Sequence, residues 1–128
     1  MTSYVLDAWS WVEYFRGSEK GQLVRKELDI GAEFLTSVIS MAEVVSKFKR
    51  EGLDADSAWN AVTSLSKTVP VKDNDAKEAG IIHATIKKGT PNFSLGDAFV
   101  LQTARKLGCP ILTGDPDFRR VKEARMLT

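Results

Sequence analysis

Short apolar runs alternate with helical patterns along this chain, and this alternation limits the fold more than any other feature of the sequence. Residues 4–6, 33–36 and 110–113 predict buried strands, residues 69–71 an extended segment, and residues 124–127 an edge strand. The helices expected between them cover residues 8–15, 19–28, 41–51, 56–65, 75–88 and 95–107. Strands that alternate with helices favour a parallel sheet covered on both faces. The sequence therefore predicts one α/β domain over residues 1–128, a three-layer α/β/α sandwich around a central parallel sheet.

Two of these helices begin with recognisable capping residues. Ser40 has Glu43 three positions later, which is the spacing of a capping box, and Ser94 precedes the last helix. The first helix is unusual because four aromatic residues fall within seven positions, namely Trp9, Trp11, Tyr14 and Phe15. One apolar stripe cannot bury four such rings. We therefore expect some of them to be exposed and to form a protein-binding surface.

The composition suits one compact domain and excludes several classes of protein. The chain has 128 residues, 43% of them hydrophobic, and a formal net charge of +1, so bulk charge alone does not bind it to nucleic acid. Its single cysteine, Cys109, excludes an internal disulfide and a cysteine-rich metal site. The sequence shows neither a membrane-spanning stretch nor a secretory signal, so we expect a cytoplasmic protein.

Four acidic residues fall where a parallel sheet binds ligands. Asp7 and Asp115 directly follow apolar strand runs, and Glu43 and Asp97 lie near the starts of predicted helices. Open parallel sheets bind ligands beyond the carboxyl ends of their strands. Asp97 carries the strongest argument, because it shares helical spacing with apolar residues and an uncompensated carboxylate on a buried face costs on the order of several kcal/mol.

Each of these acids also has a purely structural interpretation. Asp7 can cap the helix that follows it, and Asp115 can be an ordinary turn residue. Glu43 can form an exposed ion pair with Lys47, four residues later. The amide groups of the first helical turn can satisfy Asp97.

Convergence of the four carboxylates favours a metal site over these separate interpretations. Carboxylates gathered in one place repel one another unless cations occupy the gap between them. Oxygen ligands select Mg²⁺, with Mn²⁺ as a substitute, whereas Zn²⁺ prefers histidine or cysteine. The only histidine, His83, falls on an apolar helical face, and we expect it in the core or at its rim.

Four segments together resemble the PIN-domain family, and within it the small single-domain toxins of the VapC type. In chain order they are Tyr4-Val5-Leu6-Asp7, Met41-Ala42-Glu43-Val44, Ser94-Leu95-Gly96-Asp97-Ala98 and residues 111–118. The resemblance implies a PIN-like fold in which the catalytic, metal-binding residues are Asp7, Glu43, Asp97 and Asp115. It adds Asp117 as an auxiliary ligand and Thr113 as a supporting residue. One departure is Trp9, since many members carry a small hydroxyl residue at that position.

The activity implied by this resemblance is that of a Mg²⁺-dependent endoribonuclease. Metal-activated water would hydrolyse an RNA phosphodiester and leave 3′-hydroxyl and 5′-phosphate ends. The resemblance also implies a VapB-like antitoxin partner and a homodimer. Candidate contacts to RNA phosphates are basic residues near the acidic segments, namely Lys47, Lys87, Lys88, Arg119 and Arg120. Taken singly, each of them also fits a solvated surface.

Other α/β proteins with acidic sites fit this sequence less well. A receiver-type signalling domain needs paired acids after its first strand, and a haloacid-dehalogenase-type phosphatase needs Asp-x-Asp there. Ala8 and Trp9 follow Asp7 here and supply neither pattern. Two alternatives stay open within the family, namely an RNA-processing nuclease without an antitoxin and a catalytically silent RNA-binding module.

Overall fold

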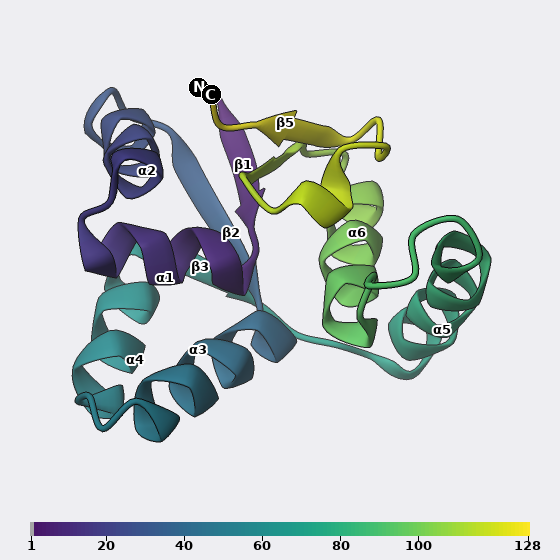
Figure 1. The fold of residues 1–128 in the computed structure, drawn as a ribbon, viewed down its shortest axis with the longest axis horizontal. Helices are drawn as coiled ribbons and strands as arrows, with labels where there is room; N and C mark the ends of the chain where they lie inside the picture. The colour runs from purple at the N-terminus through teal and green to yellow at the C-terminus, as the bar shows by residue number, and fades with distance from the viewer. Residues whose placement is uncertain (1) are drawn as a thin grey trace.

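The computed structural model describes residues 2–128, so Met1 of the predicted domain lies outside the described residues. Strands and helices alternate along most of the chain (Figure 1). In chain order the elements are β1 (Ser3–Leu6), α1 (Ala8–Arg16), α2 (Glu19–Asp29), β2 (Glu33–Ser37), α3 (Val38–Arg50), α4 (Ala55–Leu65), β3 (Ser66–Val69), α5 (Asp73–Lys87), α6 (Leu95–Leu107), β4 (Ile111–Thr113), the 3₁₀ helix η1 (Pro116–Phe118) and β5 (Ala124–Met126). No helix within residues 2–128 combines the length and the apolar character needed to cross a bilayer.

The five strands form one parallel sheet in the order β3-β2-β1-β4-β5. The predicted α/β/α fold with a central parallel sheet is therefore confirmed. The chain builds outward from β1 to β3 and then returns to place β4 on the opposite side of β1, so that Val5 pairs with Leu35 on one side and Ile111 on the other. This reversal of direction creates a switch point between β1 and β4, and α/β sheets bind ligands beyond the strand ends at such a point.

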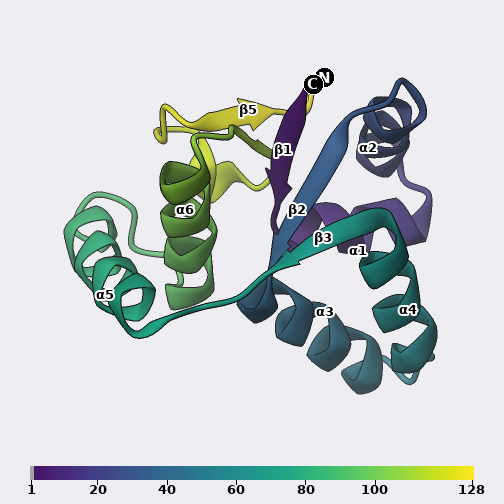
Figure 2. The same ribbon diagram turned by 180° about the vertical axis from the view of Figure 1, so that it is seen from behind.

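Alternation of side chains along β1 divides the interior into two apolar cores. Tyr4 and Leu6 belong to the core that α1 to α4 cover, whereas Val5 belongs to the core under α5 and α6. Figures 1 and 2 show α1, α2 and α4 on one side of the sheet and α5 and α6 on the other. Trp11 anchors the first core, where it is fully buried and its indole N–H donates to the Thr36 hydroxyl at 3.0 Å.

The predicted capping box at Ser40 is wrong. Ser37 is the N-cap of α3, and its hydroxyl accepts a hydrogen bond from the Ile39 N–H at 3.2 Å. Because β2 runs directly into α3 without a loop, Ser40 lies buried inside the first turn instead of at its start. Glu43 therefore has no capping role in this helix.

Other boundaries also differ from the predicted ones, most of them by one or two residues. Asp54 caps α4, which begins at Ala55, and α5 begins at Asp73. The third strand, β3, covers Ser66–Val69, where only residues 69–71 were expected to be extended. Its residues are mostly polar and exposed because β3 is an edge strand, so no apolar pattern announces it.

The expected exposed aromatic surface on α1 is also wrong. Trp11 is fully buried, and Trp9, Tyr14 and Phe15 are each half-buried. The Trp11 ring stacks on Phe15 at 5.9 Å and meets Tyr14 edge-on at 5.7 Å. Tyr14 and Phe15 also meet edge-on at 5.4 Å, so Trp11, Tyr14 and Phe15 shelter one another from water.

Candidate active site

Asp7 lies at the carboxyl end of β1 and caps α1. One of its oxygens accepts a hydrogen bond from the Ser10 N–H at 2.9 Å, and the other accepts one from the Thr113 hydroxyl at 2.7 Å. The residue is only 3% exposed. Burial raises the pKa of Asp7 from 3.8 to about 6, although these hydrogen bonds act to lower it. The capping interpretation is thus correct but incomplete, because two neutral donors do not compensate for a buried negative charge.

Thr113 connects Asp7 to the acidic turn that follows β4. Its hydroxyl donates to Asp7 and accepts a hydrogen bond from the Asp115 N–H at 3.0 Å. The Asp115 carboxylate caps η1 by accepting from the Asp117 N–H at 2.9 Å. A single hydroxyl therefore fixes the end of β1 relative to the turn that carries two further acids.

Asp97 approaches from the first turn of α6. The predicted cap at Ser94 is confirmed, and its hydroxyl accepts from the Asp97 N–H at 3.0 Å while the Asp97 carboxylate accepts from the Ser94 N–H at 2.9 Å. Burial raises the pKa of Asp97, Ser94 lowers it, and the nearby carboxylates of Asp115 and Asp117 raise it further. Burial and Asp115 likewise raise the pKa of Asp117.

Glu43 reaches the same place from α3. The residue is exposed as a whole, but its carboxylate rests against the backbone of Gly96, where an added Cβ would stand 2.4 Å from Glu43 Oε2. Partial burial of the carboxylate raises the pKa of Glu43 to about 7, with smaller contributions from Asp97 and Asp7. The residue therefore holds its proton more tightly than an ordinary glutamate.

The expected alternative for Glu43 was an ion pair with Lys47. That pair is absent from the described residues, since Lys47 Nζ lies 4.0 Å from the Glu51 carboxylate instead. None of the salt bridges within residues 2–128 involves Glu43, Asp7 or the three other aspartates of this site. The acids thus lie close together, and no cationic side chain within residues 2–128 forms a salt bridge that would compensate their negative charge.

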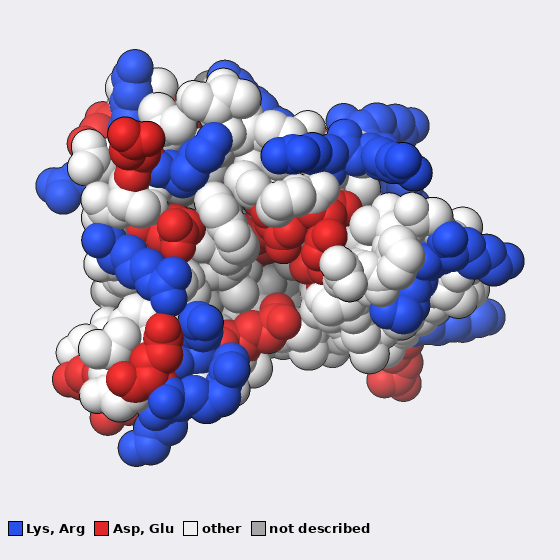
Figure 3. Space-filling model, in the orientation of Figure 1, with Lys and Arg blue, Asp and Glu red and all other residues white. Residues whose placement is uncertain are grey.

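These acids line one small hollow at the carboxyl edge of the sheet. Its volume is about 290 Å³. Five of its ten lining residues are acidic, namely Asp7, Glu43, Asp97, Asp115 and Asp117. Figure 3 shows acidic side chains gathered in a depression near the centre of this face, with Lys and Arg side chains around its margin. We refer to this feature as the acidic hollow, and it contains every acid that the sequence singles out.

The acidic hollow fits a hard divalent cation. One carboxylate oxygen from each of Asp97, Asp115 and Asp117 lies within 4.8 Å of the others. A cation relieves the repulsion among such groups, and a set of oxygen ligands suits Mg²⁺ or Mn²⁺. Asp117, which the sequence gives only an auxiliary role, belongs to this closest group, whereas Asp7 and Glu43 lie beside it.

The basic residues expected to contact RNA lie outside the acidic hollow. They are Lys47, Lys87, Lys88, Arg119 and Arg120, and none of them is among the residues that line it. Lys87 donates to the Pro91 carbonyl at 2.7 Å, and Arg120 reaches the Gly89 carbonyl at 3.5 Å. His83 is half-buried on α5, at the rim of the core, and does not line the hollow either.

Two glycines that sequence reasoning did not assign a role shape the acidic hollow. Gly96 leaves room for the Glu43 carboxylate, and Gly114 leaves room for the Trp9 indole, whose Cη2 would stand 2.5 Å from a Cβ at position 114. Each glycine directly precedes an acid of the site in the sequence. The Gly-Asp pair, which occurs at both positions, is the feature of the sequence that could have indicated these two close contacts.

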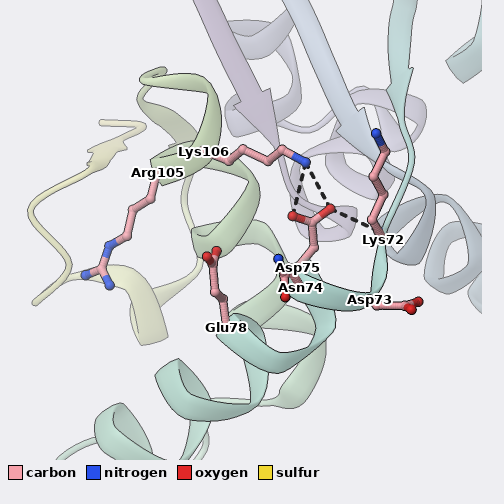
Figure 4. Close-up of a pocket in the computed structure, with 7 residues that line it drawn as sticks. All are labelled: Lys72, Asp73, Asn74, Asp75, Glu78, Arg105 and Lys106. Atoms are coloured by element: carbon pink, nitrogen blue, oxygen red, sulfur yellow. Dashed lines mark hydrogen bonds and ion pairs between the residues drawn. The ribbon is translucent and has the colours of Figure 1, made fainter.

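A larger hollow, of about 1040 Å³, lies between the start of α5 and the end of α6 and holds another buried aspartate (Figure 4). Asp75 is 5% exposed and accepts hydrogen bonds from the Lys72 N–H at 2.9 Å and the Lys106 ammonium at 3.0 Å. The Gln102 amide donates to it as well, at 3.0 Å. These donors, the Lys72 N–H first and Lys106 next, lower the pKa of Asp75. Because this charge is already compensated, the smaller acidic hollow is the better candidate.

Comparison with known proteins gives one family model and several related folds. The PIN domain model matches residues 4–124, whereas no curated protein matches the chain. A toxin-antitoxin complex from Klebsiella pneumoniae is similar with a TM-score of 0.77 at 16% identity, over 98% of each chain. DNA-bound VapBC from Salmonella typhimurium gives 0.73 at 17% identity, over 98% of this chain and 97% of that one. VapC20 from Mycobacterium tuberculosis, described as a sarcin-ricin loop cleaving toxin, gives 0.64 at 14% identity, over 83% and 84%.

Proposed function

The chain belongs to the PIN-domain family, and on this basis we propose that it is a metal-dependent endoribonuclease of the VapC type. One observation carries the proposal, namely that five carboxylates meet at the switch point of a parallel sheet and form no salt bridge within residues 2–128. Carboxylates alone repel a phosphodiester, whereas carboxylates that hold a divalent cation attract one.

The closest group of acids, Asp97, Asp115 and Asp117, would hold the cation, with Asp7 beside it. When bound, a Mg²⁺ or Mn²⁺ ion supplies Lewis-acid stabilisation of phosphoryl oxygens and lowers the pKa of water. The protein keeps the ligands fixed, since the Thr113 hydroxyl holds Asp7 in place. Fixed ligands avoid the cost of reorganising the site during the reaction.

Glu43 is the group best placed to exchange a proton in the acidic hollow. Its carboxylate approaches from α3, against Gly96, and lines the hollow together with Asp115 and Asp117. Burial raises its pKa to about 7 in the metal-free protein, and a cation held by the neighbouring aspartates would lower it, which leaves a carboxylate able to exchange a proton at neutral pH. Glu43 would thus receive the proton of the attacking water or supply one to the leaving oxygen.

The acidic hollow has room for a phosphate and part of one nucleotide, at about 290 Å³. We propose that its substrate is unpaired RNA. Proteins that act on specific positions of RNA generally bind single-stranded loops and ends. A related fold described as a sarcin-ricin loop cleaving toxin fits the same expectation for this chain.

The likeness to toxin-antitoxin complexes supports an antitoxin partner, and we propose that a VapB-like antitoxin binds this chain and silences it. From the family resemblance alone, we also propose that two copies of the chain form a homodimer. Five basic residues outside the acidic hollow, Lys47, Lys87, Lys88, Arg119 and Arg120, would contact RNA phosphates beyond the scissile one. Gel filtration of the chain alone and together with the product of a neighbouring gene tests both assemblies.

Metal-dependent cleavage of RNA tests the proposed activity. Purified protein is incubated with a mixed pool of single-stranded RNA in Mg²⁺, in Mn²⁺ and in EDTA, with single-stranded DNA as a second substrate. We expect cleavage of RNA in either metal, none in EDTA, and products with 3′-hydroxyl and 5′-phosphate ends. The Asp97→Asn variant should lose the activity.

Two results would contradict this assignment. Cleavage in EDTA that the wild type shows and Asp97→Asn lacks would exclude a metal-dependent mechanism. Folded protein that binds RNA but cleaves nothing in either metal would favour the catalytically silent module.

A further inference from the structure

Trp9 is the one aromatic residue among those that line the acidic hollow. It lies in the first turn of α1, two residues after Asp7. The outer edge of its indole rests against Gly114, where an added Cβ would stand 2.5 Å from Cη2 and 2.7 Å from Cζ3. The ring therefore connects the two strand ends that carry Asp7 and Asp115, and its position is tied to theirs.

The Trp9 ring is not part of the fully buried core. Trp11 fills that core at 0% exposure, and its indole N–H is satisfied by Thr36. Trp9 packs against this core and stays half-buried. Part of its apolar side chain is thus left open to water among carboxylates, where contact with an apolar plane would stabilise it.

We propose that Trp9 stacks on the base of the nucleotide next to the scissile phosphate. The inference rests on the proposed function, since it takes the phosphate to lie at the acidic hollow. A nucleotide holds its base one ribose away from its phosphate, so a phosphate at Asp97 and Asp115 brings a base within reach of the adjacent indole. The acidic hollow therefore offers one nucleotide two contacts, namely the acidic site for its phosphate and the Trp9 indole for its base.

Stacking on Trp9 has consequences for the choice of RNA. It selects unpaired nucleotides, because the bases of a double helix are already stacked on one another. It accepts every base, since each has a π-face, but it favours bases that stack strongly. We therefore expect single-stranded substrates and a preference for purines at the nucleotide that flanks the cleaved bond.

Tryptophan fluorescence measures this contact without cleavage. The chain has three tryptophans, and Trp59→Phe removes the one that is 46% exposed on α4. Trp9 is then the only tryptophan within residues 2–128 that solvent reaches, because Trp11 is fully buried. Titration of Trp59→Phe with a mixed single-stranded RNA hexamer in Ca²⁺ should quench the emission saturably, and a gel shows whether the hexamer stays intact. The quenching should disappear in the double variant Trp9→Phe/Trp59→Phe.

Two substitutions separate stacking from packing. Trp9→Leu keeps an apolar side chain without an aromatic plane, and Trp9→Phe keeps a plane. We expect Trp9→Leu to raise the KM for single-stranded RNA roughly tenfold and to flatten the base preference beside the cleaved bond, whereas Trp9→Phe stays within about threefold of the wild type. A residue that served only to pack α1 would lower the melting temperature in these variants without changing the base preference.

The results distinguish this inference from the proposed function. An unchanged KM and base preference in Trp9→Leu, or quenching that persists without Trp9, would overturn the stacking role. Absence of metal-dependent cleavage by the wild type would refute the proposed function instead, and the fluorescence titration would still show whether Trp9 contacts a base.

Discussion

Asp7 and Asp75 are two buried aspartates whose pKa values are shifted in opposite directions. The two residues are 3% and 5% exposed, although burial is the largest cause of the pKa shift only at Asp7, since Asp75 lines the larger hollow. Asp75 receives an ammonium group from Lys106 in addition to neutral donors, and its pKa is lowered. Asp7 receives only two neutral donors, and burial raises its pKa to about 6.

The difference separates a structural carboxylate from one that needs an outside partner. At Asp75 the protein itself supplies the donors that compensate the carboxylate, namely the Lys72 N–H and the Lys106 ammonium. The bond from Lys106 also connects the first turn of α5 to α6. Around Asp7 the protein adds further acids instead of a cation, and their repulsion destabilises the site unless a cation is present. Burial alone does not mark an acid as a candidate functional group, and the missing charge compensation is what makes Asp7 one.

Replacement of each aspartate by asparagine should have the largest effect and tests the comparison directly. Asp7→Asn should lower metal-dependent RNA cleavage by on the order of 100-fold or more, because it removes a charge beside the metal site while it keeps the volume of the side chain. Asp75→Asn should leave the rate per folded molecule within about twofold of the wild type. Initial rates, normalised to the folded fraction from circular dichroism, measure both. Equal losses in the two variants would show that the distinction is wrong.

The pH dependence of stability should differ between the two sites. Folding raises the pKa of Asp7 from 3.8 to about 6, so the folded chain holds this proton more tightly than the unfolded chain. The free energy of unfolding of the metal-free protein should therefore fall as the pH rises through this window, by on the order of 3 kcal/mol from Asp7, and level off above it. Asp75, whose pKa is lowered, should act in the opposite direction and lose its contribution below pH 3.8.

Urea denaturation in EDTA between pH 4 and pH 7.5 measures this effect. The difference between the wild type and Asp7→Asn gives the contribution of Asp7 together with its smaller effect on the pKa of Glu43. The decline should be smaller in Asp7→Asn, and saturating Mn²⁺ should reduce it in the wild type. Parallel curves for the two proteins would contradict the raised pKa.

Gly96→Ala should have a smaller effect and tests the close approach that shapes the acidic hollow. The added methyl group displaces the Glu43 carboxylate, and we expect cleavage to fall roughly tenfold to a hundredfold while the helix stays intact. Gly80→Ala on α5, the helix of Asp75, is the matched control because its Cβ meets open space. It should leave cleavage unchanged and stabilise the chain by roughly 0.5–1 kcal/mol. A similar loss of activity in both variants would exclude the steric explanation.

Lys106→Met should have the smallest effect of the four and removes the compensation of Asp75. The lysine side chain is 41% exposed, so solvent screens the ion pair and the melting temperature should fall by only a few degrees, roughly. The pKa of Asp75 should rise toward its ordinary value, which NMR titration of the carboxyl group detects. RNA cleavage should not change. A pKa that stays low would assign the effect to the Lys72 N–H alone.

The sequence predicted most of the fold because its signals are local. The apolar runs of β1 and β4 and the Ser94 cap of α6 follow from residues close together in the chain. The predictions were wrong where context outweighs local pattern. Ser40 has the spacing of a capping box, yet β2 runs directly into α3, and the polar edge strand β3 has no apolar signal.

The candidate site was predictable as a list of acids but not as an arrangement. Strand ends indicated Asp7 and Asp115, and helical spacing indicated Asp97. The family resemblance implied only an auxiliary role for Asp117, although its carboxylate lies in the closest group. The contacts of Gly96 and Gly114 were not predicted, because each glycine makes room for a side chain that lies far away in the sequence.

By itself, the sequence determined the order of strands and helices and placed acids at the strand ends, because caps, apolar periods and turns depend on neighbours within a few positions. Only the tertiary structure decided which acids are compensated. Asp75 meets Lys106, 31 residues later, whereas Asp7 meets Thr113, 106 residues later, and a hydroxyl in place of an ammonium leaves its charge unbalanced. The physical reason is that charge compensation is a property of distances in space, which the packing of distant segments sets.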